Sequence, residues 1–263
     1  MQQINYHQES KNIINWIQKV FSESGMKKIV IGMSGGIDSS VACALVSQAI
    51  GKEKVIPMLL PYKGLSAEGV EDAWLVIDHL GIKREQGRVV DIREGVEKIW
   101  SSVSRDSGQA GMTTRKGNVM ARVRMIYLFD IAKRERALVC GTENKSEHYL
   151  GYFTRFGDEA SDLEPIRHLY KTQVWEMGRY VGLPEKVITK APTAGLWEGQ
   201  TDEGELGFSY AVADQVLYYY IDEKISEADI IAEGIDAEVV KQVLQRVKDN
   251  TFKQQLPFVY NKG

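Results

Sequence analysis

Apolar residues recur along this chain in two patterns, one typical of buried strands and one typical of helices. Short runs rich in β-branched residues predict strands that are buried on both faces. They lie at residues 27–32, 54–61, 87–92 and 137–141. Apolar residues spaced three and four apart predict helices at residues 5–22, 41–50, 67–80, 93–103, 118–134, 171–181, 208–221, 226–233 and 236–249.

Predicted strands and helices alternate over the first 141 residues, with no hairpin signal between the strands. Such alternation requires crossover connections, which place the strands in parallel. The predicted fold class is therefore α/β, a doubly wound parallel sheet followed by a helical C-terminal subregion. We expect residues 1–263 to form a single domain, with an α/β core at about 1–185 and a lid with helices at about 186–263.

Three segments fit neither pattern and predict functional loops. Residues 142–170 follow the last predicted strand and are rich in glycine, aromatic and charged residues, while residues 191–207 have the composition of a lid. Long loops in compact domains tend to carry function. Residues 104–117, rich in glycine and serine, predict a second mobile flap.

Composition narrows the class of protein without identifying it. The 263 residues are 43% apolar and 26% charged, which is typical of a globular protein. A net charge of −3 gives no overall attraction to nucleic acid, and no apolar run reaches the roughly 20 residues of a membrane helix. The polar amino-terminal residues lack the order of a secretion signal. Cys43 and Cys140 stand far apart in apolar stretches and predict buried spectators, so we expect a cytoplasmic protein.

The segment after the first predicted strand is the most informative part of the chain. It runs Gly32, Met33, Ser34, Gly35, Gly36, Ile37, Asp38, Ser39 and Ser40. Open α/β sheets bind ligands at the carboxyl ends of their strands, where this segment lies. Its small residues let backbone amides converge on an anion, and the following helix points its positive end there. The hydroxyls of Ser34, Ser39 and Ser40 add donors, so the segment predicts a polyphosphate site.

Asp38 gives this loop a chemistry of its own. A carboxylate beside a polyphosphate is repulsive unless a cation lies between them, so Asp38 predicts a Mg²⁺ ligand. The loop lacks the Lys-Ser/Thr pair of a Walker loop and the GxGxxG spacing of a dinucleotide-binding fold. The structural alternative is a glycine-rich turn in which Asp38 only caps the helix.

The SGGxDS sequence of this loop resembles the pyrophosphate loop of the N-type ATP pyrophosphatases, which cleave ATP to AMP and pyrophosphate. Three further segments resemble the ammonia-dependent NAD synthetases in particular, and they occur in that family's order. They are residues 117–125, 141–158 and 190–207. The resemblance covers residues 29–257 and implies the adenine nucleotide alpha hydrolase-like form of the doubly wound fold.

The resemblance implies a site for ATP and metal. Glu147 matches the family's second Mg²⁺ carboxylate, the partner of Asp38. Two carboxylates with phosphate oxygens and water suit the octahedral geometry of Mg²⁺. Thr142, Thr193 and Lys171 match ATP-binding positions, and Lys171 joins Asp38 and Glu147 as a catalytic residue. Because Lys171 begins a predicted helix, where the dipole disfavours a cation, it indicates a compensating anion. The structural alternative for Glu147 is a solvated glutamate in a loop, and the alternative for Lys171 is a surface lysine.

The resemblance also implies a site for the dinucleotide acid. The positions that bind deamido-NAD are matched by Arg122, Arg155, Asp162 and Lys253. Arginine suits a carboxylate or pyrophosphate because its planar fork binds two oxygens. This chain departs from the family pattern near these positions: Arg155 stands where lysine is usual, Glu159 and Ala160 where two glycines are common, and Phe252 where histidine is common.

The implied activity is ATP-dependent amidation of nicotinic acid adenine dinucleotide with ammonia. The nicotinate carboxylate attacks the α-phosphorus of ATP, and ammonia then attacks the acyl-adenylate to give NAD⁺, AMP and pyrophosphate. The chain has no room for the glutaminase domain of glutamine-dependent relatives, so free ammonia is the expected donor, with a separate glutaminase subunit as the alternative. The family also implies a homodimer without nucleic-acid or membrane partners, and the apolar residues within 120–129 are a candidate interface.

Two other classes of protein stay open. Another ATP pyrophosphatase, such as a GMP synthetase subunit or a tRNA-modifying enzyme, shares the loop, although the acidic charge and the three further segments argue against it. A non-catalytic nucleotide-binding module binds ATP without cleaving it. The pairing of Asp38 with Glu147 favours catalysis, and loss of ATP cleavage in Asp38→Asn and Glu147→Gln with the fold intact separates the two classes.

Overall fold

The computed structural model of the protein describes residues 4–62, 67–103, 112–197, 199–255 and 260. In this part of the chain four strands form one parallel sheet in the order β3-β2-β1-β4. Their bounds are β1 Lys28–Gly32, β2 Val55–Leu59, β3 Arg88–Val89 and β4 Ala137–Cys140. Each coincides with a predicted strand, and the α/β class with a parallel sheet is confirmed.

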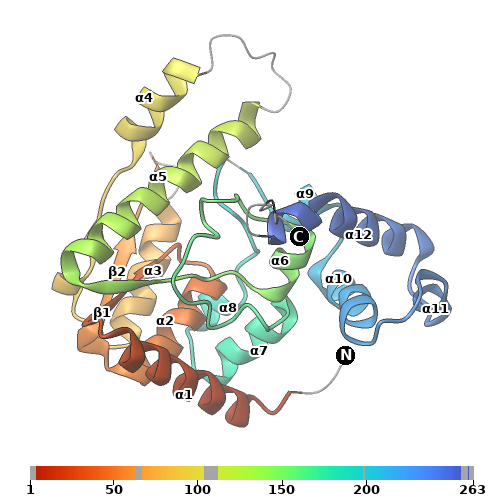
Figure 1. Ribbon diagram of the computed structural model, residues 1–263, viewed down its shortest axis with the longest axis horizontal. Helices are drawn as coiled ribbons and strands as arrows, with labels where there is room; N and C mark the ends of the chain where they lie inside the picture. The colour runs from red at the N-terminus through yellow and green to blue at the C-terminus, as the bar shows by residue number, and fades with distance from the viewer. Residues whose placement is uncertain (1–3, 63–66, 104–111, 198, 256–259, 261–263) are drawn as a thin grey trace.

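Helices connect the strands and continue beyond the sheet (Figure 1). The α-helices are α1 Tyr6–Ser24, α2 Ile37–Ile50, α3 Ala67–His79, α4 Arg93–Val103, α5 Met112–Glu135, α6 Lys145–Leu150, α7 Lys171–Tyr180, α8 Glu185–Ile188, α9 Asp202–Leu206, α10 Tyr210–Leu217, α11 Glu227–Ala232 and α12 Ala237–Asn250. Shorter helical segments are η1 Lys52–Lys54, η3 Arg84–Gln86, η4 Tyr218–Asp222 and η5 Thr251–Gln254. Among the residues described, no helix has both the length and the apolar character needed to cross a membrane.

Alternate residues of β1 supply the two halves of the core, because successive side chains of a strand point to opposite faces. Ile29 and Ile31 pack in one apolar cluster with α1, α2, α3 and α7. Val30 packs in the other with α4 and α5. All three side chains are fully buried, and each such burial contributes about 1.5–3 kcal/mol. The central strand is therefore fixed from both faces, and the loop at its carboxyl end starts from a rigid frame.

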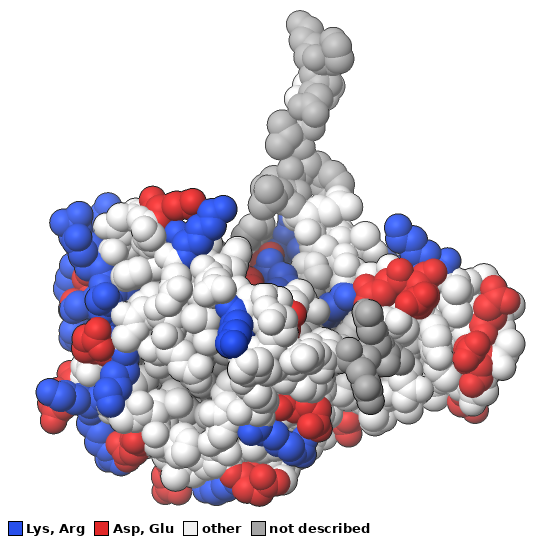
Figure 2. Space-filling view, turned by 90° about the horizontal axis from the view of Figure 1, so that it is seen from below, with Lys and Arg blue, Asp and Glu red and all other residues white. Residues whose placement is uncertain are grey.

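The C-terminal helices form a third apolar cluster beside the sheet (Figure 1). Tyr210 of α10 and Leu244 of α12 are buried in it, and Leu150 and Tyr170 join it to the α/β part. On the face seen in Figure 2, lysine and arginine side chains gather at the end formed by the sheet, while carboxylates predominate at the end formed by the C-terminal helices. The predicted helical C-terminal subregion is present and packs through its own core.

Two predicted loops contain short helices. Residues 142–170 include α6 and residues 191–207 include α9, which are six and five residues long. Each begins at a side-chain cap, Asn144 for α6 and Thr201 for α9. A cap satisfies backbone N–H groups that a short helix otherwise leaves free. Local hydrogen bonds rather than apolar spacing form these helices, so the periodicity of the sequence does not reveal them.

Two further helix predictions differ from the structure in their bounds. Helix α5 begins at Met112, so the expected flap at 104–117 is helical from that residue on, and residues 104–111 lie outside the described part of the chain. The helix predicted at 208–221 changes at Tyr218 from α10 to the π-helical η4.

Candidate active site

A cavity of about 530 Å³ opens at the carboxyl ends of β1 and β4. In the strand order β3-β2-β1-β4, the chain passes from β1 to β2 on one side, and β4 lies on the other. Such a reversal leaves a crevice at the strand ends, where open α/β sheets bind their ligands. The cavity is lined by the loop after β1 and by parts of α5, α6, α7, α9 and α12. Its volume lies in the range of small-molecule sites.

The loop after β1 is ordered by its own hydrogen bonds. Gly36 is the N-cap of α2, and its backbone N–H donates to Ser34 Oγ at 3.2 Å. Ser34 Oγ lies 3.1 Å from Ser39 Oγ, and both residues line the cavity. Ser40 is fully buried and its hydroxyl donates to the Gly36 carbonyl at 2.7 Å. The prediction that Ser40 adds a donor for phosphate is therefore wrong, because its side chain is fully buried and, unlike that of Ser39, lies outside the cavity lining.

Gly35 is required by packing as well as by its backbone conformation. Its φ is +79°, and a Cβ there would lie 2.3 Å from the carbonyl oxygen of Gly69 in α3. It would also lie 3.0 Å from Asp72 Cβ. Within residues 32–39, Gly35 is the residue that does not line the cavity. Its role in the structure is to let α3 pack directly against the loop.

Asp38, Lys171 and Glu147 meet at the cavity, although they come from three separate segments. Asp38 lies in the first turn of α2, Glu147 in α6 and Lys171 at the start of α7. Lys171 Nζ donates to Asp38 Oδ2 at 2.5 Å and to Glu147 Oε1 at 3.1 Å. The lysine side chain is 3% exposed and the carboxylates 17% and 16%. The two carboxylates are the anions that the helix position of Lys171 requires.

Asn144 fixes the relative positions of the two carboxylates. Its Nδ2 donates to Asp38 Oδ1 at 2.9 Å, and its Oδ1 accepts from the backbone N–H of Glu147 at 2.9 Å. The same side chain therefore caps α6 and contacts the first turn of α2. Asn144 and Glu147 have the spacing of a capping box, which is a signal that the sequence carries.

Burial and charge shift the pKa values of this cluster. Burial raises the pKa of Glu147 above its ordinary value, while the neighbouring ammonium of Lys171 opposes that shift. Burial by itself lowers the pKa of Lys171, but Asp38 and Glu147 outweigh it and hold that pKa above its ordinary value. Lys171 thus stays charged at neutral pH, and a cation or a phosphate that enters the site meets a fixed ammonium.

The residues of this cluster fit Mg²⁺ as far as their chemistry goes. Asp38 and Glu147 supply carboxylate oxygens, the donors that Mg²⁺ prefers, and both side chains retain exposed surface at the cavity. Within the described part of the chain no group of three or more His, Cys, Asp or Glu residues is placed to hold a metal ion. Mg²⁺ usually keeps several waters and takes phosphate oxygens, so a site with two protein carboxylates suits it.

Most of the predicted ATP residues lie on this cavity. Its lining includes Gly32, Met33, Ser34, Gly36, Ile37, Asp38, Ser39, Thr142, Glu147, Lys171 and Thr193. Thr142 follows Gly141 just after the end of β4, and Thr193 belongs to the segment before α9. Lys253 also lines the cavity, where its Nζ donates to the carbonyls of Gly151 at 2.6 Å and Phe153 at 3.1 Å. The predicted lysine is thereby held against the part of the cavity wall formed by Gly151 and Phe153.

The other three residues predicted for the dinucleotide lie outside the lining of this cavity. Arg122 Nη2 donates to the carbonyl of Arg155 at 3.1 Å, and Arg155 Nη2 donates to the carbonyl of Gln255 at 2.7 Å. Asp162 Oδ2 accepts from the backbone N–H of Val139 at 2.7 Å. The structure therefore brings Arg122 and Arg155 together at the surface and leaves Asp162 beside β4.

Several charged residues on the cavity were not predicted to have a role. They are Glu68, Arg124, Asp158, Lys190, Asp202, Glu205 and Arg246. Arg124 is held by a bond from its Nε to the carbonyl of Leu60 at 3.1 Å, and Arg246 Nε donates to the carbonyl of Leu150 at 3.1 Å. Asp202 is 3% exposed, and its Oδ2 accepts from the hydroxyl of Tyr210 at 3.3 Å. Arg246 lies in an amphipathic helix, where a charge at helical spacing resembles a solvated surface, so no signal in the sequence marks it.

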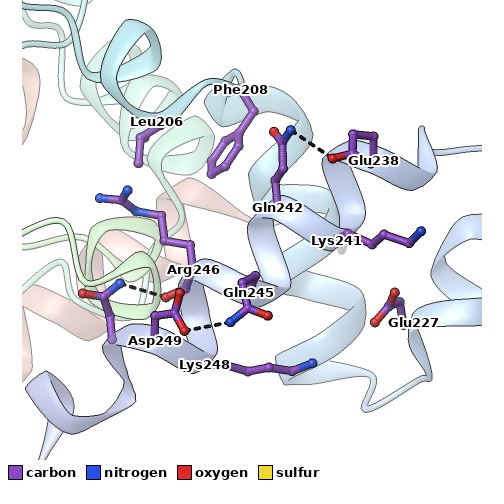
Figure 3. A pocket seen from close by; sticks show the side chains of 11 residues that line it. Leu206, Phe208, Glu227, Glu238, Lys241, Gln242, Gln245, Arg246, Lys248 and Asp249 are labelled. Atoms are coloured by element: carbon purple, nitrogen blue, oxygen red, sulfur yellow. Dashed lines mark hydrogen bonds between the residues drawn. The ribbon is translucent and has the colours of Figure 1, made fainter.

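A second hollow, of about 650 Å³, lies along α12 (Figure 3). Its lining mixes carboxylates and cations, such as Glu238 and Lys241. Gln245 Nε2 donates a hydrogen bond to Asp249 Oδ1 at 2.7 Å. This mixture offers no excess charge to a polyphosphate, and the hollow is shallow. The cavity at the strand ends is therefore the candidate active site, and Arg246 is the residue that borders both.

Known proteins match this chain over most of its length. The sequence profile of NAD synthase matches residues 9–257. The NH(3)-dependent NAD(+) synthetase of Chlorobaculum parvum is 42% identical over 247 residues, which cover 94% of this chain and 86% of that relative. The structure of an NMN synthetase from Francisella tularensis matches with a TM-score of 0.85 and 32% identity, covering 98% of this chain and 100% of that chain. An NH3-dependent NAD synthetase from Campylobacter jejuni, solved with nitrate ion, matches with a TM-score of 0.80 and 26% identity, covering 98% and 100%.

Proposed function

This chain belongs to the NAD synthase family and catalyses ammonia-dependent NAD⁺ formation, and we propose that the cavity at the ends of β1 and β4 is where it does so. The substrates are nicotinic acid adenine dinucleotide, ATP and ammonia, and the products are NAD⁺, AMP and pyrophosphate. The observation that carries the assignment is the contact of one buried ammonium, Lys171 Nζ, with both Asp38 and Glu147 beside the phosphate loop.

In the first step a nicotinate carboxylate oxygen attacks the α-phosphorus of ATP. The bond from that phosphorus to the bridging oxygen breaks, and pyrophosphate leaves with the electron pair. The loop of Ser34, Gly36 and Ser39 holds the phosphates through backbone N–H and hydroxyl donors at the start of α2. Lys171 presents a fixed positive charge to the same place. Little covalent chemistry is required of the protein, because positioning and charge stabilisation dominate phosphoryl-group displacement.

Mg²⁺ belongs to the proposal, with Asp38 and Glu147 as its protein ligands. When bound, the ion neutralises phosphate charge that would otherwise repel the two carboxylates. Asn144 holds the two carboxylates at fixed positions relative to each other, because its side chain donates a hydrogen bond to Asp38 and caps the helix that carries Glu147.

In the second step ammonia attacks the acyl carbon, AMP leaves, and the amide of NAD⁺ forms. Water must be kept from the acyl-adenylate, because hydrolysis regenerates the acid. Residues within 190–197 and 199–207 line the cavity: Leu196 packs against Gly117 of α5, and Gln200 Nε2 donates to Glu205 at 3.0 Å. We propose that this segment covers the intermediate.

The size of the acid is a second question, raised by the match to an NMN synthetase at a TM-score of 0.85. Nicotinic acid mononucleotide carries the same reacting carboxylate as the dinucleotide and lacks the adenylate half. Arg122, Arg155 and Asp162 lie away from the cavity lining, and we propose that they contact the adenylate half. On this proposal the dinucleotide is the preferred acid, because the mononucleotide cannot reach them.

A homodimer and a cytoplasmic location complete the proposal. Ile99 and Val103 of α4 and Ile126 of α5 are 40%, 50% and 55% exposed on two helices that pack together, and we take them as the candidate subunit contact. Met120 and Val123, by contrast, are buried in the core, so the candidate interface within 120–129 is reduced to its outward residues. Cys43 and Cys140 are free buried thiols, which suits a reducing compartment.

The experiment follows all products from the purified chain with ATP, Mg²⁺ and ammonium, with either the dinucleotide or the mononucleotide as the acid. We expect NAD⁺ and AMP to appear in equal amounts, and kcat/KM to be at least about tenfold higher for the dinucleotide. Glutamine in place of ammonium gives no turnover. AMP formation that depends only on the mononucleotide assigns the other acid, and ATP binding without AMP formation contradicts the enzymatic assignment altogether.

A further inference from the structure

Asp72 is a fully buried carboxylate that holds two lysines. It lies in α3 with 0% of its side chain exposed. Lys190 Nζ is 2.5 Å from its Oδ2, and Lys186 Nζ is 2.6 Å from its Oδ1. An anion that is buried so completely requires paired cations, and one lysine is enough to balance its charge. The second lysine is one cation more than Asp72 itself requires.

The two lysines differ in where their side chains lie. Lys186, in α8, is 55% exposed and does not line the cavity. Lys190 is 18% exposed and lines the cavity together with Glu68 and Gly69. Lys190 therefore places its positive charge at the cavity, while the ammonium of Lys186 faces solvent.

Helix α3, which carries Asp72, packs against the phosphate loop at Gly35. The carbonyl oxygen of Gly69 and the Cβ of Asp72 are the atoms that occupy the space beside Gly35. Because α3 packs so closely on the loop, the Asp72–Lys190 pair is fixed relative to Ser34 and Gly36. Glu68, the other acid near Lys190, is 68% exposed at 3.8 Å and is screened by water.

We propose that Lys190 is a catalytic residue that binds the β- and γ-phosphate oxygens of ATP and the departing pyrophosphate, and that Asp72 is its positioning residue. This role rests on the proposed function of the cavity. When the bond between the α-phosphorus and its bridging oxygen breaks, the electron pair and the negative charge pass to pyrophosphate. Lys171 lies on the carboxylate side of the loop and Lys190 on the α3 side, so the leaving group is held between two cations.

The matched test compares Lys190→Met with Lys186→Met, because both changes remove one cation from the same carboxylate. Pyrophosphate and AMP are followed with saturating dinucleotide and ammonium while ATP is varied. Lys190→Met is expected to lower kcat/KM for ATP about a hundredfold, and Lys186→Met to stay within about twofold of the unmodified chain. Lys190→Arg, which keeps the charge, is expected to restore part of the loss. Equal losses in the two methionine variants would show that Lys190 only stabilises Asp72, and would overturn the proposal.

A binding measurement gives a readout that does not depend on turnover. Calorimetry with inorganic pyrophosphate and Mg²⁺ is expected to show a Kd about tenfold weaker in Lys190→Met and unchanged in Lys186→Met. Asp72→Asn keeps the shape and is expected to weaken pyrophosphate binding while Lys190 loses its fixed position. If the unmodified chain forms no NAD⁺ but Lys190→Met still weakens pyrophosphate binding, the proposed function fails and the role of Lys190 stands. If the unmodified chain is active and the two methionine variants bind pyrophosphate alike, the role of Lys190 fails alone.

Discussion

Lys171 is the residue on which the charge balance of the cavity depends. Its ammonium is the shared partner of Asp38 and Glu147, and its side chain is almost completely buried. A methionine at this position keeps the volume and removes the charge, so the two carboxylates would face each other and the incoming phosphates without a cation. We therefore expect one substitution of Lys171 to affect both stability and catalysis.

We expect Lys171→Met to lower AMP formation at least about a hundredfold and the free energy of unfolding by about 3 kcal/mol. The control is Lys145→Met, which removes another lysine of an ion pair, 2.6 Å from Asp222 and away from the cavity lining. Lys145→Met should keep nearly full activity. Product assays and urea unfolding measure the two effects, and a Lys171→Met protein with activity within about threefold of the parent would refute the role given to Lys171.

The buried carboxyl of Glu164 should make the stability of the fold depend on pH, independently of catalysis. Burial raises the pKa of its carboxyl from 4.5 to about 7, against the lowering effect of Arg167. The folded state thus favours the protonated form, so the contribution to stability is complete below about pH 4.5 and is lost as the pH rises through about 7. The full range corresponds to about 3 kcal/mol.

Glu164→Gln should remove this slope, because the amide mimics the neutral acid at every pH. Urea unfolding of both proteins between about pH 5 and 8 measures it, and the glutamine variant should become the more stable of the two as the pH rises. Parallel curves for the two proteins would mean that Glu164 is ionised throughout and that the assignment is wrong.

At the scale of elements, the site depends on how short helices begin. Helix α6 has six residues, and its cap, Asn144, is also the group that donates to Asp38 in α2. Helix α11 also has six residues and is capped by Ser226, whose Oγ accepts from the backbone N–H of Asp229 at 3.2 Å. The two caps are comparable in their local bonds, but only Asn144 touches a residue of the site.

Asn144→Ala and Ser226→Ala should therefore have similar effects on stability and different effects on activity. Each loss of a cap costs about 1 kcal/mol. Asn144→Ala should also raise the KM for ATP by about tenfold or more, since Asp38 loses its fixed orientation. Thermal unfolding and steady-state kinetics check both. An Asn144→Ala protein as active as Ser226→Ala would limit Asn144 to a cap.

Much of the fold was predictable because its elements follow the two periods of the chain. The strands of the sheet and the long helices on its faces carry apolar runs that a window of sequence detects, and the predicted phosphate loop lies where β1 ends. Helices α6 and α9 were missed because they are too short for a period and are formed by the caps Asn144 and Thr201. Ser40 was misassigned because a hydroxyl in a helix cap and one facing a ligand look alike in sequence.

At the scale of the whole molecule, the site is assembled from segments far apart in the chain. The motifs identify Asp38, Glu147 and Lys171, and the structure brings these three together. The sequence could not place Lys190 against Asp72, because that contact joins positions 118 residues apart without any motif between them. It also could not separate residues that line the cavity from those, such as Arg122, that lie at the surface.

The proposed homodimer can be tested by changing the exposed apolar residues of α4 and α5. Ile126→Asp places a charge on the outward side of α5, where the side chain is 55% exposed. Because an unpaired charge in an apolar contact is unfavourable, this change should shift the mass measured by light scattering from dimer to monomer without altering the monomer fold. Tyr260→Asp, a change at another exposed position, is the control. A monomeric parent protein would contradict the dimer.

The central claim is that ATP is attacked at its α-phosphorus by the carboxylate of the dinucleotide in this cavity. The most direct measurement uses a dinucleotide whose nicotinate carboxylate carries a heavy oxygen isotope, with mass spectrometry of the AMP formed alongside NAD⁺. Attack through the carboxylate predicts that the label appears in the phosphate group of AMP, and that Asp38→Asn abolishes both products together. Unlabelled AMP, or label in inorganic phosphate with ADP as the other product, would contradict the account.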